Sequence, residues 1–202
     1  MAGRPRSFDR AAALKSAMAV FWQRGYEGTA LSDLTAAMGI SAPSLYAAFD
    51  CKENLFREAI RLYQDVEGAA VKRAMDAAPD ARAMVEAMLR TNIGHYTDPA
   101  KPPGCMIVLA ATLGTPENSP VREHLSALRR SAVADLKRRL ERHRAAGRLP
   151  EGADTTALAE FYSTVLQGLS IQARDGASRR ALDRIAAAAM AAWDGLAEKR
   201  KA

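Results

Sequence analysis

The chain has 202 residues, which is long enough to bury a sizeable core and to form one medium-sized domain or a small domain joined to a larger one. Hydrophobic residues make up 49% and charged residues 26%, the usage of an ordinary globular protein, and two cysteines are too few for a disulfide framework. The formal net charge of +6 suits nucleic acid, an anionic membrane surface or an acidic partner, and equally serves plain solubility.

No targeting or membrane segment is expected. Residues 1–9 are polar and lack the apolar stretch of a signal peptide. No run of about 18 apolar residues is present that would span a bilayer. We therefore expect no membrane contact and a protein of the reducing cytoplasm.

The residue pattern predicts an all-α fold. Alanine, the best helix former, is frequent throughout, and no window alternates apolar and polar residues as a strand does. The apolar spacing predicts about nine helices. We place an N-terminal three-helix bundle at residues 1–50 and a larger helical domain at residues 51–202.

The first 24 residues are predicted to form a flexible basic arm, residues 1–6, followed by a helix over Asp9–Arg24. Gly25 supplies the stop signal of this helix. Its predicted apolar face consists of Leu14, Ala17, Met18, Phe21 and Trp22.

Two short helices with a tight turn between them follow, the arrangement of a helix-turn-helix. The first covers residues 30–38 and is predicted to be capped by Thr29. Gly39 tolerates the positive φ of the turn, and Ser41 is predicted to cap the second helix, residues 42–48.

A long helix is predicted from the Asp50–Glu53 segment to about Met75. Asp50 followed by Glu53 has the spacing of a capping box, with Asp50 as the cap. The predicted apolar stripe consists of Phe56, Ala59, Ile60, Tyr63 and Val66.

Five further helices are predicted in the second domain. They cover residues 81–96, 105–113 and 119–146, a segment capped by Asp154, and a segment that follows Ser178. Ser119 and Pro120 provide a cap followed by a proline at the first helical position. Ala132 is expected to face inward from its helix, as is Ile185 from the last.

The segment from Phe8 to Tyr63 contains many residues in a characteristic order and spacing. They are Phe21, Trp22, Gly25, Tyr26, Gly28, Thr29, Leu34, Met38, Gly39, Ile40, Pro43, Ser44, Leu45, Tyr46, Phe49, Lys52, Glu53, Leu55 and Phe56. In this series the first third of the chain resembles the TetR-type repressor family. Further on, the resemblance lies in architecture, with echoes at residues 104–106 and 165–168.

The resemblance implies that the second short helix lies in the major groove of DNA. The DNA-binding residues it implies are Arg4, Arg6, Thr29, Ser41, Ala42, Pro43, Ser44, Tyr46 and Lys52. Residues 42–44 would meet base edges, Thr29, Tyr46 and Lys52 would hold phosphates, and the two arginines would enter a minor groove. Without the resemblance, Tyr46 is a half-buried core aromatic and Lys52 a solvated charge.

The most basic block lies outside this motif. Residues 122–148 contain nine Lys or Arg and three Asp or Glu, whereas residues 1–61 contain eight and six. The simplest interpretation is a solvated helix face. A second DNA-contacting surface is the alternative.

The resemblance also assigns the second domain to effector sensing and dimerisation. The last two helices would pair with their mates in a homodimer, which fits a palindromic operator; ordinary packing within the chain is the alternative. Tyr96, Met106, Phe161, Tyr162 and Gln167 are candidates to line an effector pocket, or else are plain core.

Cys105 is the sharper candidate for sensing. It stands at the predicted start of a helix, where the helix dipole lowers the pKa of a thiol and raises its reactivity. Some relatives with Gly-Cys here respond to oxidants or electrophiles. The alternative is a small buried hydrophobe, as free cysteines usually are. Cys51 has a similar setting beside the DNA surface.

Nothing in the sequence points to an enzyme. The three histidines lie far apart, no group has metal-ligand spacing, and no phosphate-binding glycine loop is present, so no metal and no cofactor are expected. We predict a sequence-specific DNA-binding transcriptional regulator, a repressor released by an unidentified small-molecule or thiol-reactive effector. The alternatives are an architectural DNA-binding protein without such a signal and a small helical enzyme.

Overall fold

The computed structural model describes residues 8–112 and 114–198, and within them the regular structure is entirely helical, as expected. Arg4 and Arg6 lie outside the described residues. The helices are α1 (Arg10–Arg24), α2 (Leu31–Met38), α3 (Ala42–Phe49), α4 (Lys52–Asp76), α5 (Ala81–Tyr96), α6 (Met106–Leu109), α7 (Ser119–Ala145), α8 (Thr155–Arg174), α9 (Arg179–Ala191) and α10 (Trp193–Ala197), with one 3-10 turn, η1 (Pro116–Asn118), before α7. The last predicted helix is thus divided at Ala192 into α9 and α10.

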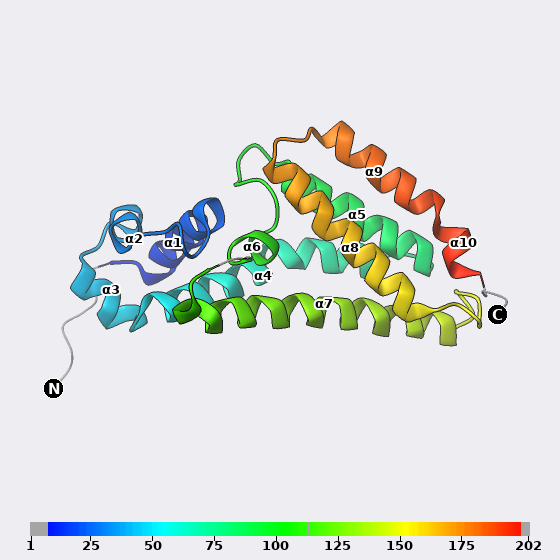
Figure 1. Ribbon diagram of the computed structural model, residues 1–202, viewed down its shortest axis with the longest axis horizontal. Coiled ribbons are helices and arrows are strands. Elements are labelled where there is room, and N and C mark those ends of the chain that lie inside the picture. The colour runs from blue at the N-terminus through cyan, green and yellow to red at the C-terminus, as the bar shows by residue number, and fades with distance from the viewer. Residues whose placement is uncertain (1–7, 113, 199–202) are drawn as a thin grey trace.

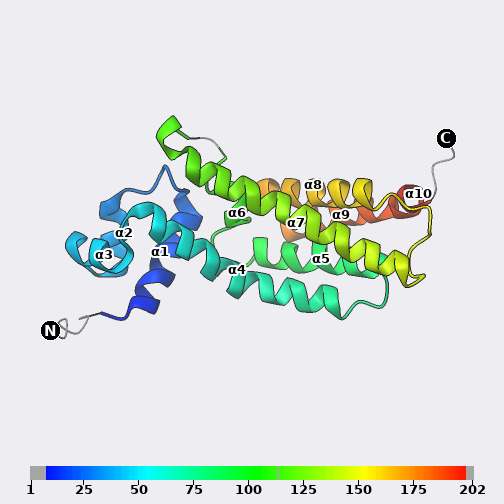
Figure 2. The same ribbon diagram turned by 90° about the horizontal axis from the view of Figure 1, so that it is seen from below.

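The molecule is elongated, with α1, α2 and α3 gathered at one end (Figure 1). Helices α5, α8, α9 and α10 form the other end, and α4 and α7 run lengthwise between the two (Figures 1 and 2). None of the helices in the described part of the chain is both long and apolar enough to cross a membrane.

Two hydrophobic clusters correspond to the two ends, and α4 takes part in both. The first cluster joins α1–α3 to the first half of α4, from Leu55 to Tyr63, and to α6. The second begins at Met75 and continues through α5, α8, α9 and α10. The first cluster extends beyond residue 50 into α4, so the packing does not separate the chain at that residue. The domain boundary between residues 50 and 51 remains a prediction.

Aromatic side chains fasten α1 to α4. Phe21 meets Phe56 edge to face, with ring centroids 5.0 Å apart, and Trp22 meets Tyr63 in the same way at 4.9 Å. Such pairs add roughly 0.5–1.5 kcal/mol beyond the burial of their surface. The first and fourth helices therefore form a firm base for α2 and α3.

Two predicted caps are confirmed. Ser41 and Asp154 each accept a hydrogen bond from a backbone N–H in the first turn of the following helix. Ser178, after which the last helix was expected, also serves as an N-cap. Asp9, predicted as the first residue of its helix, is instead the cap of α1 and accepts from Ala11 and Ala12.

Thr29 is not the cap of α2. Its hydroxyl donates to the carbonyl of Gly25 at 2.6 Å, so the helix begins one residue later with Ala30 as its N-cap. Asp33 compensates, because its carboxylate accepts from the Ala30 N–H at 2.9 Å. That carboxylate also pairs with Arg24 at 2.6 Å.

Cys51, not Asp50, is the cap of α4, and its sulfur accepts from the Asn54 N–H at 3.4 Å. Asp50 has a positive φ of 68° and reverses the chain in a γ-turn, in which the Cys51 N–H donates to the Phe49 carbonyl at 2.8 Å. The side chain of Asp50 accepts from the Asn54 amide at 3.1 Å instead of capping the helix.

The helix predicted over residues 105–113 is reduced to the four residues of α6. Two carbonyls in this segment are bonded by other elements: Arg129 donates to Ile107 at 2.9 Å, and the Tyr26 N–H donates to Ala110 at 2.7 Å. The start of α7 also differs from expectation, because its N-cap is Asn118 and not Ser119.

Three residues predicted to face inward do not. Val66 is 55% exposed and Ile185 is 42% exposed, and Ala132 is also classed as exposed. On α4 it is Glu67, the residue after Val66, that turns inward, because α5 and the loop that follows it cover that side.

The basic block on α7 is not simply a solvated face. Four of its arginines bond neighbouring elements: Arg129 to the Ile107 carbonyl, Arg139 to Asp76, Arg144 to the Ala153 carbonyl and Arg148 to the Pro79 carbonyl. These contacts tie α7 to α6, to the end of α4 and to the start of α8, so much of the positive charge has a structural role.

We expect Leu89→Ala to lower the free energy of unfolding by about 2–5 kcal/mol, because Leu89 is fully buried at the centre of α5 and truncation leaves a cavity. Val66→Ala is the matched control and should change it by no more than about 0.5 kcal/mol, since Val66 is exposed. Urea unfolding followed by circular dichroism measures both. Equal losses for the two variants would contradict the assignment of the core.

Candidate nucleic-acid interface and effector pocket

Helix α3 presents an outer face of small and aromatic residues at the end of the molecule (Figure 1). Leu45 and Phe49 are buried beneath it. Pro43, Ala47 and Tyr46 face outward, and Tyr46 is 49% exposed. The helix therefore offers contact surface and one hydroxyl rather than charge.

The start of α3 is held by its own serines. The Ser41 oxygen accepts from the Ser44 N–H at 3.3 Å and lies 2.9 Å from the Ser44 hydroxyl. Ala42 is half-buried beside them. The two hydroxyl groups are thus hydrogen-bonded to each other. A ligand that bound the Ser44 hydroxyl would have to share it with Ser41.

Arg10 of α1 holds α3 in position from its buried side. Its guanidinium donates to the Ala48 carbonyl at 3.2 Å and to Glu58 on α4 at 2.8 Å, and it lies 4.2 Å from the centre of the Phe49 ring. Sequence reasoning did not single out Arg10, because its partners lie 38 and 48 positions away.

Thr29 and Lys52 occupy less open positions than expected. Thr29 is 1% exposed and its hydroxyl is already bonded to Gly25, so that side chain is not presented to solvent. The Lys52 amine lies 4.3 Å above the Tyr26 ring, and burial lowers the pKa of Lys52 while Glu27 opposes the change. Lys52 is therefore a half-buried cation on an aromatic face, not a freely solvated charge.

Two basic residues that sequence reasoning missed lie beside Tyr46. Arg57 and Arg61 of α4 line a hollow of about 410 Å³ together with Tyr46, Asp50 and Glu58. Their spacing of four residues on one helix is the signal that would have found them. The structure thus gathers Ser41–Ser44, Tyr46 and Lys52 at one end of the molecule, with Thr29 in its interior.

Cys105 lines a second cavity, of about 550 Å³, between α4, α5 and α7. Its backbone N–H donates to the Ser170 hydroxyl of α8 at 2.8 Å. Cys105 packs against both hydrophobic clusters, of which one contains Tyr63 and the other Tyr96. Burial, reinforced by the Cys105 sulfur, raises the pKa of both phenols. Because α6 has only four residues, the helix dipole assumed for this thiol is weak.

The other predicted sensing residues are not gathered around this cavity. Met106 is fully buried in the first hydrophobic cluster, and the Tyr162 hydroxyl donates to the Ala189 carbonyl at 3.0 Å in the second. Phe161 is partly exposed on α8, and Gln167 is half-buried on the same helix. Of the six candidates, Cys105 lines the cavity and Tyr96 lies behind it.

Two of the ionised side chains of the cavity wall, Glu67 and Arg139, have ionic partners within the protein. Glu67 is 6% exposed, and its carboxylate bonds Lys101 at 2.8 Å and lies 3.6 Å from the His95 imidazole. Arg139 pairs with Asp135 at 2.9 Å and also with Asp76. Sequence reasoning missed the Glu67–Lys101 pair, which links α4 to the loop after α5.

The segment that carries Cys105 is bonded directly to α1. The Trp22 indole, 2% exposed, donates to the Gly104 carbonyl at 3.0 Å, and Arg174 of α8 donates to the Trp22 carbonyl at 2.6 Å. Gly104 has a φ of +78°, and a Cβ there would lie 2.6 Å from both Leu109 and the Ser170 carbonyl. Only glycine fits this junction between the two ends of the molecule.

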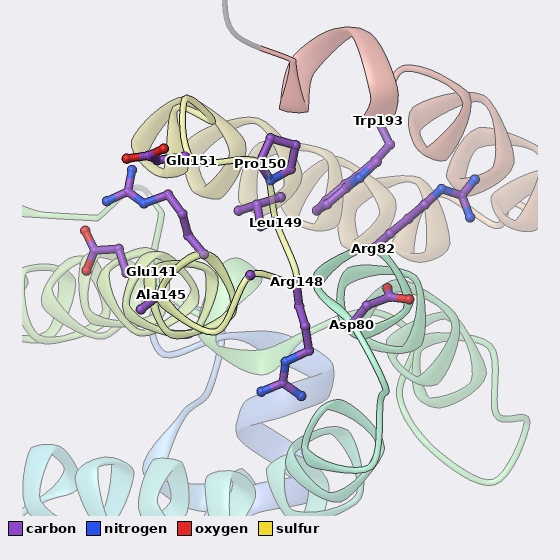
Figure 3. A pocket seen from close by; sticks show the side chains of 11 residues that line it. Asp80, Arg82, Glu141, Ala145, Arg148, Leu149, Pro150, Glu151 and Trp193 are labelled. Atoms are coloured by element: carbon purple, nitrogen blue, oxygen red, sulfur yellow. The ribbon is translucent and has the colours of Figure 1, made fainter.

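A larger hollow, of about 970 Å³, lies at the far end of the bundle (Figure 3). Leu149, Pro150 and Trp193 form one side of it, and arginines and carboxylates alternate around the rest. None of the predicted site residues lines it. Within the described residues there is no cluster of three or more His, Cys, Asp or Glu that could hold a metal ion.

Two family sequence models match the chain. The one described as "Bacterial regulatory proteins, tetR family" matches residues 13–59, and the one described as "Tetracyclin repressor-like, C-terminal domain" matches residues 79–189. Together they cover most of the chain, with α3 inside the first match and Cys105 inside the second.

Two curated relatives match over nearly their full length. The HTH-type transcriptional repressor ComR of Escherichia coli (strain K12) is 36% identical over 96% of this chain and 93% of its own. The HTH-type transcriptional repressor BdcR of the same organism is 30% identical over 94% and 90%. A solved structure of a cysteine mutant of the TetR family transcriptional regulator CifR, complexed with 26-base-pair double-strand operator DNA, is 47% identical with a TM-score of 0.92, covering 95% of this chain and 100% of that one.

Proposed function

The chain belongs to the TetR family of bacterial transcriptional regulators, and from this premise we propose that it represses transcription by binding a palindromic operator as a homodimer until an effector releases it. The observation that carries the proposal is α3, a short helix whose inner face is anchored by Leu45, Phe49 and Arg10 and whose outer face is free to enter a groove. Two relatives bear the name of repressors, and CifR is solved with operator DNA.

In this proposal α3 lies in the major groove of the operator. Ala42, Pro43 and Ala47 suit contact with thymine methyl groups, and the Tyr46 hydroxyl suits a phosphate. Lys52, at the start of α4, adds a positive charge where helix N–H groups already favour anions. Because few hydrogen-bond donors face outward from α3, the shape of the DNA carries much of the specificity.

Pairing of two chains would cover apolar side chains that the single chain leaves exposed. Phe161 and Ile171 on α8 and Ile185 on α9 are large hydrophobic residues with a third or more of their surface in contact with solvent. An exposed group of this kind is typical of an interface. A two-fold dimer through α8 and α9 would present two α3 helices to half-sites about one helical turn apart.

The effector, in this proposal, enters the cavity beside Cys105. Since Glu67 and Arg139 already have ionic partners, a charged ligand would gain little from them. Asp65 and Lys72, one of each charge, are exposed to solvent. The remaining wall includes Tyr63, Val71, Met75, Ile107 and Asn92. We therefore expect a small and mostly apolar effector, which binds non-covalently or reacts with the thiol.

Release would pass through the segment from Gly104 to Ala110. Its two ends are bonded to α1 and to the turn after it, by the Trp22 indole at 3.0 Å and by the Tyr26 N–H at 2.7 Å. A ligand that displaces Cys105 would move these acceptors. The DNA-binding end would then shift relative to its mate and lose the spacing that the operator requires.

The first test selects duplexes from a random library at about 150 mM salt, which suppresses non-specific phosphate binding. We expect enrichment of a palindrome. On that operator, Tyr46→Ala should weaken binding by about tenfold, through the loss of a phosphate contact and packing surface.

Fluorescence anisotropy of the labelled operator measures this loss. Glu151→Gln, an exposed change in the turn between α7 and α8 at the far end of the bundle, is the control and should bind like the parent. Strong retention of DNA with no enriched sequence would favour an architectural protein over a repressor.

The second test uses N-ethylmaleimide as a probe in a Cys51→Ser background. The serine hydroxyl oxygen can take the place of the capping sulfur at the start of α4, and Cys105 is then the only remaining thiol. Its sulfur adds to one alkene carbon of the maleimide and the thiol proton ends on the other, with no leaving group. We expect the adduct to weaken operator binding by about tenfold or more.

The matched control adds Cys105→Ser and should not respond to the probe. If the control is released as readily as the parent, the effect is not that of Cys105. A parent that keeps its operator affinity when fully labelled would remove the thiol from the proposal while leaving a non-covalent effector in place.

The third test removes the hydrogen bond between Trp22 and Gly104 while keeping an aromatic side chain at position 22. Trp22→Phe removes the indole N–H but keeps an aromatic ring against Tyr63. We expect operator affinity of the unlabelled protein within about threefold of the parent and a release upon labelling of Cys105 that is several-fold smaller. An unchanged release would exclude the Trp22–Gly104 bond from the coupling route.

A further inference from the structure

A small hollow lies under the turn between α4 and α5, far from α3 and separated from the Cys105 cavity by Met75 and Arg139, which line both. We call it the turn hollow. It measures about 240 Å³ and is lined by Met75, Asp76, Ala78 and Met84 on one side and by Arg139, Arg142, His143 and Arg148 on the other. It is therefore enclosed by the end of α4, the turn, the start of α5 and the last turns of α7.

Positive charge dominates the turn hollow. Three arginines and a histidine face one carboxylate, Asp76, and that carboxylate is already bonded to Arg139. Arg142 is exposed and forms no ion pair within residues 8–112 and 114–198. Arg148 makes one long contact, 3.4 Å, with the Pro79 carbonyl. Two guanidinium groups thus retain unused donors at the same place.

His143 adds an orphaned polar atom. Its Nδ1 is buried and has no hydrogen-bond partner among the described residues. Burial, together with Arg148 and Arg142, lowers the pKa of His143, and Asp80 opposes the change. A buried nitrogen without a partner is uncommon and calls for a ligand that the protein itself does not supply.

The neighbouring large hollow, unlike the turn hollow, has no excess of positive charge. Even with Arg148 counted, its three arginines face three carboxylates, those of Asp80, Glu141 and Glu151, so positive charge is not in excess there. In Figure 3 the Arg148 side chain points away from Leu149, Pro150 and Trp193. Its guanidinium therefore belongs to the turn hollow rather than to the apolar side of the large one.

We propose that the turn hollow binds a small oxyanion, either free phosphate or sulfate or the phosphoryl group of a small molecule. Arg142 and Arg148 donate to its oxygens, as guanidinium groups commonly do, and the His143 Nδ1–H completes the set. The bound anion bridges α7 to the end of α4 and to the turn. It thereby fixes the position of the helix that joins the two ends of the molecule, independently of the function proposed above.

Sulfate is the first probe, titrated calorimetrically into the full-length protein with chloride reduced to hold the ionic strength constant. We expect one saturable site. Arg142→Gln should weaken it about tenfold, because a charge-assisted hydrogen bond is lost at an exposed position that tolerates the change. Arg130→Gln is the matched control, since Arg130 is exposed on the same helix and bonds only Ser126 within it.

Absence of saturable binding would overturn the proposal. Equal weakening by Arg142→Gln and Arg130→Gln would also overturn it, because binding would then reflect the charge of the whole helix. Phosphate and phenyl phosphate are titrated in parallel. Tighter binding of the monoester identifies a phosphoryl group of a larger molecule, and equal binding identifies the free anion; both support the site.

The dependence on pH gives an independent readout. The groups that face His143 are Asp76 from α4, Asp80 from the turn, Arg139 and Arg142 from α7, and Arg148 after it. Sulfate does not titrate between about pH 6 and pH 8, whereas a histidine does. A bound anion favours the protonated imidazole, so affinity should rise several-fold as the pH falls through this range.

His143→Gln should bind sulfate with the same affinity at both ends of the range. A pH dependence that persists in this variant would exclude His143 from the site. The imidazole signal of His143 in the NMR spectrum of the parent gives the same answer directly, since its pKa should rise when sulfate is added.

Discussion

The hydrogen bond from the Trp22 indole to the Gly104 carbonyl holds the two ends of this molecule in register. It is buried, 3.0 Å long, and joins residues 82 positions apart in the chain. Gly104 can take part only because it has no side chain, since Leu109 and the Ser170 carbonyl occupy the space of a Cβ. Arg174 and Ser170 of α8 bond the same junction from the other side. Helix α1, the segment that carries Cys105 and helix α8 of the proposed dimer interface therefore meet at this junction.

The outward face of α3 depends on contacts that lie behind it. Arg10 bonds the Ala48 carbonyl and Glu58 and covers Phe49, and the γ-turn at Asp50 directs the chain from α3 into α4. Because these contacts anchor α3, the small residues on its outer face are not needed to hold the helix in place. Such a face suits a groove whose shape matters more than its pattern of hydrogen-bond donors and acceptors.

The sequence predicted features that depend on near neighbours. Ser41 and Asp154 cap their helices as predicted, because each is followed within three residues by an N–H that needs an acceptor. Prediction failed where distant residues compete for the same groups. Arg129 and Tyr26, 22 and 84 positions away, take the carbonyls of Ile107 and Ala110 that would have continued α6. Thr29 failed as a cap for a local reason, because its hydroxyl donates to the Gly25 carbonyl four positions before it. Cys105 was identified from its neighbours in the chain, whereas the Glu67–Lys101 pair and the turn hollow required the fold.

The most direct measurement of this coupling is hydrogen exchange of the Tyr26 amide, which donates to Ala110 at 2.7 Å. It is followed by mass spectrometry in the Cys51→Ser protein before and after N-ethylmaleimide labels Cys105. We expect labelling to speed exchange at Tyr26 and at Cys105 while the amides of Leu45 and Phe49 in α3 stay protected. Loss of operator binding with unchanged exchange at Tyr26 would contradict a route through this junction, and so would loss of protection throughout α3.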